Sequence, residues 1–345
     1  MTIAPGEPLL VVERLHVQFP TDEGVVQAVR GMDLALYPRE VLAVVGESGS
    51  GKSATSLAIM GLLPRTAQVS GSIRLSGAEL LGRSEDELAA VRGSDIAMIF
   101  QDPLSSLNPV YPVGDQLAEA VLAHQKVGRA VASSRAVELL DIVGIPNPKQ
   151  RADAYPHELS GGMRQRVVIA MAMANDPDVI IADEPTTALD VTVQAQVLES
   201  LERARAETHA AMLLITHDLG VVAGQADRVM VMYAGRPVEV GTAEDVYYEP
   251  RMPYTLGLLG SLPRLDASGR DRLTPIPGSP VSLVDLPVGC PFAPRCPMRQ
   301  TRCLIEEPAL LATDRADHLA ACHFSEDLVG VRPRDLYQEQ NGGAA

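Results

Sequence analysis

The sequence predicts an α/β protein with a parallel core sheet, an antiparallel β region near the N-terminus and an inserted block of helices. Residues 41–45 and 179–182 are short, uninterrupted apolar runs, as expected for strands buried on both faces. Apolar residues at helical spacing dominate from about residue 102 to 176 instead. Strands that alternate with helices in this way favour a layered α/β core.

The elements follow one another along the chain. Residues 9–19 and 25–29 are short apolar or alternating runs separated by turn residues, which predicts a β-hairpin. Further strands are expected at residues 31–38, 71–77, 96–100, 211–215, 228–233 and 238–240. Helices are expected at residues 54–60, 113–124 and 130–143 and after residue 162, the third of them ended by Gly144, Pro146 and Pro148.

Residues 46–53 read Gly-Glu-Ser-Gly-Ser-Gly-Lys-Ser and lie between a predicted strand and a predicted helix. This is the spacing of a phosphate-binding loop, in which glycines let backbone N–H groups approach the phosphates at a helix N-terminus. Lys52 would reach the β- and γ-phosphates, and Ser53 would ligate Mg²⁺. The alternative is an ordinary Gly/Ser-rich turn, which the Lys-Ser pair and the flanking elements disfavour.

Polar residues follow the other predicted core strands. Gln101 follows residues 96–100, Asp183 and Glu184 follow residues 179–182, and His217 follows residues 211–215. Because α/β sheets bind ligands at the carboxyl ends of their strands, Asp183 is expected to hold Mg²⁺ and Glu184 to polarise the attacking water. The alternatives are solvated acids at a strand end and a structural histidine. A predicted helix begins at Ser160, Gly161 and Gly162. These residues form either a second anion site or only the start of the helix.

Composition limits the class of protein. The 345 residues are 46% apolar, enough for about two domains, and a net charge of −15 with a pI near 4.9 argues against a broad nucleic-acid surface. No apolar run approaches the roughly 18 residues that cross a membrane, and the N-terminus resembles no secretory signal. We therefore expect a cytoplasmic chain that meets the membrane through partners.

All four cysteines, Cys290, Cys296, Cys303 and Cys322, lie in the last quarter of the chain. In a reducing compartment such clustering suggests a metal site rather than disulfides. The spacing does not match common zinc knuckles, and the Cys-Pro steps at Cys290 and Cys296 resemble those of iron–sulfur ligation, whereas His323 beside Cys322 keeps zinc open. Reduced structural cysteines are the remaining alternative.

Taken together, these motifs resemble those of the ATP-binding subunits of ABC transporters over roughly residues 5 to 250. The resemblance identifies residues 46–53 as the Walker A loop, 159–163 as the signature motif, 179–183 as the Walker B strand and 188–190 as the D-loop. Met163 stands where the family usually has Gln. The implied catalytic residues are Lys52, Gln101, Glu184 and His217, and the implied Mg²⁺ ligands are Ser53, Gln101 and Asp183. The implied ATP-binding residues are Phe19, Gly46, Glu47, Ser48, Gly49, Ser50, Gly51, Lys52, Ser53, Ala54, Gln101, Ser160, Gly161, Gly162, Asp183 and Asp190, with Phe19 stacked on adenine.

The family architecture implies a RecA-like core, an antiparallel β subdomain and an inserted helical subdomain. It also implies a head-to-tail dimer in which ATP lies between one subunit's Walker A loop and the other's Ser160. Closure of this dimer on ATP and reopening after hydrolysis would produce the work.

A narrower resemblance, to the dipeptide and oligopeptide importer ATPases, comes from residues 45–60, 99–109 and 183–191 and from the region after about residue 250. Met252 stands where this subfamily usually has His. The resemblance implies a nucleotide-binding domain over residues 1–250, with its helical insertion at about 102–176, and a C-terminal lobe over 251–345 whose four cysteines hold a four-iron four-sulfur cluster. Zinc stays the alternative.

The implied partners are a second related ATPase subunit, two membrane permease subunits and an extracytoplasmic peptide-binding protein, with no nucleic acid. The chain would lie peripherally on the cytoplasmic face of the membrane. Two alternatives stay open: import of another small solute, such as a nickel chelate or a sugar, and a soluble ABC ATPase acting on ribosomes or DNA. A single cassette and the acidic balance favour transport.

Overall fold

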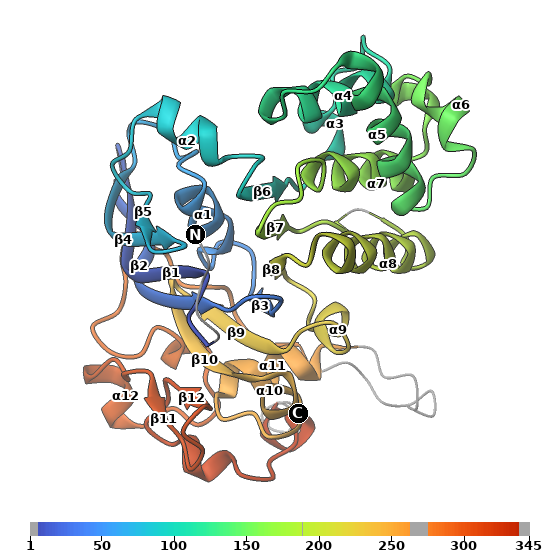
Figure 1. Ribbon diagram of the computed structural model, residues 1–345. Helices are drawn as coiled ribbons and strands as arrows, with labels where there is room; N and C mark the ends of the chain where they lie inside the picture. Colours follow the sequence, from blue (N-terminus) through green and yellow to red (C-terminus); the bar gives the residue numbers. More distant parts are fainter. Residues whose placement is uncertain (1–5, 188, 263–274, 338–345) are drawn as a thin grey trace.

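The computed structural model describes residues 6–187, 189–262 and 275–337, and Figure 1 shows how the regions within them are arranged. An antiparallel sheet (blue to cyan) and a larger mixed sheet lie against one another, a helical lobe (green) projects from the larger sheet, and the C-terminal region (orange to red) packs against its other side. The predicted α/β class is confirmed.

The antiparallel sheet has the order β2-β1-β4-β5. Its strands are β1 (Leu10–Thr21), β2 (Gly24–Leu36), β4 (Gln68–Leu75) and β5 (Ala78–Glu79). The predicted hairpin is present, with Thr21 opposite Gly24 at its turn. The strands expected at residues 25–29 and 31–38 are one continuous strand, β2, because its pairing with β1 continues on both sides of Gly31, which lies at a register shift between Arg30 and Met32.

The larger sheet has the order β11-β12-β10-β9-β3-β8-β7-β6. The five strands from β9 to β6 run parallel: β9 (Arg228–Tyr233), β3 (Val41–Val45), β8 (Ala211–Thr216), β7 (Val179–Asp183) and β6 (Ile96–Ile99). Every residue of β3, β7 and β8 is buried, as their apolar runs predict. Because these strands are parallel, the segments that follow β3, β6, β7 and β8 meet at one edge of the sheet.

The helical lobe follows β6. Its elements are α3 (Pro103–Ser106), α4 (Val113–His124), α5 (Arg129–Ile142), α6 (Pro148–Ala152), the 3₁₀ turn η1 (Pro156–Glu158) and α7 (Gly161–Ala172). The helices predicted at residues 113–124 and 130–143 match α4 and α5 to within one residue at each end. Leu117, Leu139, Ile169 and their neighbours form a core that continues onto β6 and β7, so the lobe is packed on the sheet rather than tethered to it.

The remaining helices of the nucleotide-binding region cover the sheet. They are α1 (Lys52–Ile59), α2 (Glu85–Val91), α8 (Val191–Thr208), α9 (Leu219–Val222) and α10 (Ala243–Tyr248), and α11 (Pro253–Gly260) follows at the start of the C-terminal region. No helix among the described residues is long and apolar enough to cross a membrane.

The C-terminal region is joined to the same sheet. It contains the 3₁₀ turn η2 (Ala293–Arg295), α12 (Thr301–Ile305), β11 (Leu311–Ala312), β12 (Leu319–Ala320), the 3₁₀ turn η3 (Ser325–Leu328) and α13 (Pro333–Tyr337), and β12 pairs with β10 (Arg236–Thr242). Met252, Tyr254 and Phe292 share a buried core with Ala43 and Val45 of β3. The apolar core of this region is therefore shared with the main sheet.

Candidate functional site

A cavity with both polar and apolar walls opens where the parallel strands end. It brings together eleven sequence-predicted residues from five segments of the chain, namely Phe19, Glu47, Ser48, Gly49, Gly51, Lys52, Ser53, Ala54, Gln101, Glu184 and His217. The other walls come from Val26, Ala28, Leu258, Pro280 and Leu283. Half-buried Phe19 lies with Val26 and Ala28 on the apolar side, which suits the stacking on a nucleobase that was predicted for it.

The phosphate-binding loop is shaped by its glycines. Gly51 has φ of 105°, and a Cβ at this position would lie 2.3 Å from the carbonyl oxygen of Ala28. Only glycine fits this backbone without displacing β2. Helix α1 begins at Lys52, the next residue, so its unpaired N-terminal N–H groups face the cavity where anionic phosphates would lie.

Lys52 is held across the loop before any phosphate binds. Its side chain is 4% exposed, and Nζ donates to the carbonyl oxygens of Gly46 at 2.7 Å and Glu47 at 3.0 Å. Burial lowers the pKa of Lys52, while the negative charges of Glu184, Asp183 and Glu47 oppose that shift. The ammonium group therefore lies beside the cavity with its loop contacts already made.

Asp183 ends β7 against the first turn of α1. Its Oδ1 accepts a hydrogen bond from Ser53 Oγ at 3.1 Å, and its Oδ2 accepts one from Ser56 Oγ at 3.2 Å. Burial raises the pKa of Asp183, and the two serine hydroxyls and Lys52 counteract this effect. The carboxylate of Asp183 and the hydroxyl of Ser53 are hard oxygen ligands in direct contact, so the donor set fits Mg²⁺.

Glu184 is oriented by three neighbours. Its Oε2 accepts hydrogen bonds from the amide of Gln101 at 3.1 Å and the hydroxyl of Thr187 at 2.8 Å, and it lies 3.3 Å from Nδ1 of His217. The Glu184 side chain is 15% exposed and that of His217 is 55% exposed, so the pair lies at the cavity mouth. Glu184 has φ of 48°, and its backbone N–H donates to Ile215 on β8, which fixes the turn after β7.

The signature residues lie outside this cavity. Ser160 is exposed and caps α7 by accepting a hydrogen bond from Met163 N–H, and neither Ser160 nor Gly161 nor Gly162 is among the described residues that line the cavity. Asp190 caps α8 by accepting from Thr192 and Val193 and does not line it either. Of the predicted D-loop, residue 188 lies outside the described residues.

Gly46, Ser50 and Asp183 are buried and are not among the described residues that line the cavity. Ser50 is buried next to Gly46, whose added Cβ would lie 2.7 Å from Ser50 Oγ. These residues support the loop from below, and Asp183 meets the cavity through Ser53.

Sequence reasoning missed several residues that complete the site. Ser56 stands three residues after Ser53 on α1, a spacing that brings side chains together on one helical turn and could have identified it, whereas Thr187 lies in the turn after β7 and carries no such signal. Tyr254 and Arg295, which contact the phosphate-binding loop from the C-terminal region, carry no local signal. Only tertiary packing brings them there.

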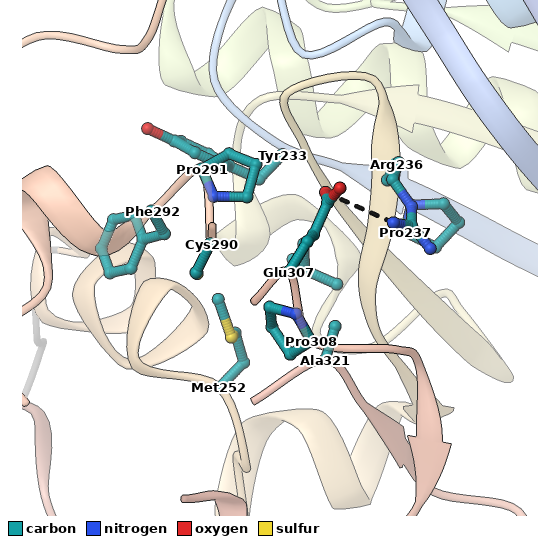
Figure 2. Close-up of a pocket in the computed structure, with 11 residues that line it drawn as sticks. Tyr233, Arg236, Pro237, Met252, Cys290, Pro291, Phe292, Glu307, Pro308 and Ala321 are labelled. Carbon is teal, nitrogen blue, oxygen red and sulfur yellow. Dashed lines mark ion pairs between the residues drawn. The ribbon is translucent and has the colours of Figure 1, made fainter. Parts of the chain in front are cut away.

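The four cysteines gather around a second, small apolar cavity under the C-terminal region. All four line it, together with residues such as Met252, Phe292 and Met298, and none forms a disulfide. Figure 2 shows Cys290 with Met252 and Phe292 at an adjoining pocket, where Glu307 forms an ion pair with Arg236 at 3.3 Å.

Burial raises the pKa of the thiols of Cys290, Cys296 and Cys322, the latter two to about 12. Backbone N–H groups of Phe292, Met298 and Phe324 point at these sulfur atoms. Among the described residues, no group of three or more His, Cys, Asp or Glu side chains is arranged to hold a metal ion. The predicted metal site is thus not established by the structure.

Comparison with protein families agrees with this geometry. The ABC transporter family matches residues 29–187, and the C-terminal region of oligopeptide/dipeptide transporters matches residues 238–303.

Similar curated proteins are transport ATP-binding proteins. The chain is 59% identical over 332 residues to the oligopeptide transport ATP-binding protein OppD of Mycobacterium bovis. The matched residues cover 96% of this chain and 54% of that protein. It therefore spans about half the length of this relative and of the Mycobacterium tuberculosis protein of the same name. It is 55% identical to the dipeptide transport ATP-binding protein DppD of Bacillus subtilis, covering 86% of this chain and 89% of that protein.

Solved structures give the same fold. A dimeric ATP-binding cassette in a post-hydrolysis state with ADP and Pi matches with a TM-score of 0.61 and 25% identity, over 68% of this chain and 98% of that one. A cassette from an ABC transporter complex of Clostridium perfringens matches with a TM-score of 0.60 and 27% identity, over 70% and 92%. The cavity, the two family matches and the match to the Bacillus subtilis protein agree with one another. The chain therefore belongs to the family of ATP-binding subunits of oligopeptide and dipeptide ABC transporters.

Proposed function

We propose that this chain binds and hydrolyses ATP to power the uptake of oligopeptides or dipeptides through membrane permease subunits. The observation that carries the proposal is the convergence of Lys52, Ser53, Gln101, Glu184 and His217 on one cavity at the ends of four parallel strands. The C-terminal family match favours peptides over the other small solutes that the sequence leaves open.

The binding step uses groups already in place. Lys52 would exchange its carbonyl contacts for the β- and γ-phosphates, and the N–H groups at the start of α1 would receive the remaining phosphate oxygens. Ser53 and Asp183 would hold Mg²⁺, with Gln101 at the cavity edge as the further ligand predicted from sequence. Bound there, Mg²⁺ supplies charge neutralisation at the phosphate oxygens.

Hydrolysis would depend on Glu184. Its carboxylate accepts from Gln101 and Thr187 and faces His217, so it can accept a proton from a water molecule aligned with the γ-phosphate. His217, more exposed than Glu184, would orient the same water or the phosphate from the cavity mouth. Lys52 would stabilise the charge that develops on the phosphate oxygens.

The site is completed by a second subunit in this proposal. Ser160 and the two following glycines lie at the N-terminus of the twelve-residue helix α7, outside the chain's own cavity, and so are available to the phosphates of a neighbour. The match to a dimeric cassette supports a pair of such subunits, and the head-to-tail arrangement follows the family resemblance. The second member, following the family, is a related ATPase, and Asp190 would lie at the interface between the two.

Partners in the membrane are proposed on the same basis: two permease subunits and an extracytoplasmic peptide-binding protein, with this chain peripheral on the cytoplasmic face. A groove beside Gln101 would receive a permease segment. It is lined by Leu62, Met98 and Phe100 among other residues, and the exposed Leu104 and Val110 follow in the adjoining segment. Such clustered apolar exposure is typical of a contact surface.

The test is ATP hydrolysis by the complex that co-purifies with this chain from membranes, supplied with its peptide-binding protein. We expect stimulation by oligopeptides or dipeptides. Stimulation only by a nickel chelate or a sugar would contradict the peptide assignment while keeping the ATPase, and recovery of the chain with ribosomes or DNA and without a permease would contradict the transport assignment.

We further propose that Cys290, Cys296, Cys303 and Cys322 hold a four-iron four-sulfur cluster. Four thiols around one apolar cavity, with backbone N–H groups directed at the sulfurs, form a donor set that fits such a cluster. The Cys-Pro steps at Cys290 and Cys296, which resemble those of iron–sulfur ligation, favour the cluster over zinc. In this position it would tie together a region whose core is shared with the main sheet.

Iron and acid-labile sulfide are measured on anaerobically purified protein, with Cys303→Ser as the matched variant. We expect about four of each per chain in the wild type, by the stoichiometry of such clusters, and a strong reduction in the variant. One zinc per chain without iron would show that the cysteines hold zinc and not a cluster. If neither metal is found, the cysteines are reduced structural thiols.

A further inference from the structure

The C-terminal region contacts the phosphate-binding loop directly, at Glu47. Arg295 forms a two-pronged ion pair with the carboxylate of Glu47, with N···O distances of 2.6 and 2.9 Å, and its Nε donates to the carbonyl oxygen of Pro277 at 3.0 Å. The hydroxyl of Tyr254 accepts a hydrogen bond from the backbone N–H of Glu47 at 2.8 Å. The second residue of the loop is therefore held by both its side chain and its backbone.

Both contacts are buried. The Arg295 side chain is 3% exposed and Tyr254 is fully buried, while the side chain of Glu47 keeps 27% exposure. The guanidinium carbon of Arg295 lies 5.9 Å from the ring centroids of Tyr233 and Phe292, so aromatic rings flank the cation. The pair keeps a defined geometry, because the Arg295 side chain is almost fully buried and its fork makes two hydrogen bonds to the carboxylate of Glu47.

The same segment belongs to the cysteine cavity. Arg295 is the residue before Cys296, and Phe292 is two residues after Cys290. The ring of Phe292 packs against those of Tyr254 and Tyr233, with centroid distances of 5.4 and 5.3 Å. Hydrogen bonds from Ala293 N–H to Cys290 and from Cys296 N–H to Ala293 make residues 290–296 one compact turn. A shift of either cysteine would therefore move the groups that hold Glu47.

We propose that Arg295 and Tyr254, here called the loop clamp, are positioning residues for ATP binding and that they transmit changes at the cysteine cavity to the phosphate-binding loop. This inference rests on the proposed function, since it concerns ATP bound at that loop. Lys52 Nζ contacts the carbonyl oxygens of Gly46 and Glu47, so a displaced Glu47 would also displace the lysine that receives the phosphates.

The first test measures the Kd of Mg–ATP for the full chain. It also measures the kcat and KM of ATP hydrolysis by the complex. Arg295→Gln should weaken ATP binding about tenfold, the factor expected for losing a charge-assisted hydrogen-bond pair. The Kd of Arg295→Lys should lie between those of the wild type and Arg295→Gln, because lysine keeps the positive charge but cannot make the two-pronged contact of the guanidinium group. The kcat at saturating ATP should stay within about twofold, because Glu184 and His217 are untouched.

Tyr254→Phe keeps the packed ring and removes only the hydroxyl, so it tests the clamp even if Arg295→Gln fails to fold. It should weaken ATP binding about threefold. Arg332→Gln is the matched control, because Arg332 lies in the same region but forms an exposed ion pair with Asp335. Thermal unfolding of each variant separates loss of the fold from loss of loop position.

The second test is a double-mutant cycle between the cavity and the clamp. Cys296→Ser should weaken ATP binding severalfold in the wild-type background and by a clearly smaller factor in Arg295→Gln, because only the Tyr254 contact then connects the cavity to Glu47. Equal factors in both backgrounds would refute the transmission. Unchanged affinity in both Arg295→Gln and Tyr254→Phe would refute the clamp, whereas a wild-type chain that binds no Mg–ATP would contradict the proposed function instead.

Discussion

Gln101 donates its side-chain amide to Glu184 Oε2 at 3.1 Å, so the segment that leads into the helical lobe holds the carboxylate that follows β7. Any movement of the lobe that displaces Gln101 removes a hydrogen bond from Glu184 at the mouth of the cavity. In an ATPase driven by lobe movement, this contact would link the position of the lobe to the orientation of the group that activates water.

Glu184→Gln should abolish most hydrolysis and preserve ATP binding. The amide can keep the contact with Thr187, but it cannot take a proton from water, so we expect turnover to fall about 10²- to 10⁴-fold, or about 3–5 kcal/mol of barrier. Phosphate release and the Kd of Mg–ATP are measured side by side, with the exposed Glu199→Gln on α8 as control. If the partner ATPase has its own site, that site must be disabled as well. Near-normal turnover would rule out the role given to Glu184.

Lys52→Ala should weaken the binding of Mg–ATP. The substitution removes the ammonium group that lies against the carbonyl oxygens of Gly46 and Glu47 and that would receive the phosphates. We expect the Kd of Mg–ATP to rise at least tenfold, measured by calorimetry on the full chain. Binding as tight as in the wild type would contradict the proposed place of the phosphates.

Protonation of Asp183 at acidic pH should weaken Mg²⁺ binding. The same protonation should stabilise the folded chain when no nucleotide is bound. Burial raises the pKa of Asp183 above its ordinary value of 3.8, so the folded state binds this proton more tightly than the unfolded state does. The Asp183 contribution to folding stability therefore increases as the pH falls through the window between the raised pKa and 3.8. Over the same window protons compete with Mg²⁺ for the carboxylate.

The measurement compares wild type with Asp183→Asn, which cannot titrate at this position. Mg²⁺ dependence of nucleotide binding and chemical unfolding are followed across acidic pH, and the difference between the two proteins isolates Asp183 from the other carboxylates. A difference in unfolding free energy that does not vary with pH would show that the pKa of Asp183 is not raised.

Ser160→Arg should block hydrolysis in the assembled complex without changing the affinity of the isolated chain for ATP. Ser160 caps α7 and lies outside the cavity of its own chain, so a bulky cation there would obstruct only a neighbour's nucleotide. Affinity is measured on the chain alone and turnover on the complex. Weaker binding by the isolated chain would place Ser160 in the chain's own site and contradict the shared one.

Gly51→Ala should destabilise the fold by more than about 2 kcal/mol, because the new methyl group would meet the Ala28 carbonyl oxygen and the backbone has a positive φ. Gly224→Ala is the control, since no atom lies within 4 Å of a Cβ built there, and it should change stability by less than about 0.5 kcal/mol. Urea unfolding of both variants gives the comparison. Equal stabilities would show that the loop can relax around the methyl group.

Local patterns in the chain are enough to predict the central strands and most of the residues that line the cavity. Residues 41–45, 179–182 and 211–215 are apolar throughout, and parallel strands place the groups that follow them at a common edge, so Lys52, Glu184 and His217 could be brought together from their positions in the chain. The phosphate-binding loop was recognisable because its function requires glycines at fixed spacing.

Only the tertiary structure decided what holds that loop. Arg295 is 248 residues away from Glu47 in the chain, and neither residue type nor spacing indicates that they pair. Their contact depends on a core shared between β3 and the segments that contain Tyr254 and Phe292, and such a core is set by the packing of many side chains at once. Local patterns identify groups that meet through regular strands and helices, whereas contacts between distant irregular segments arise from packing alone.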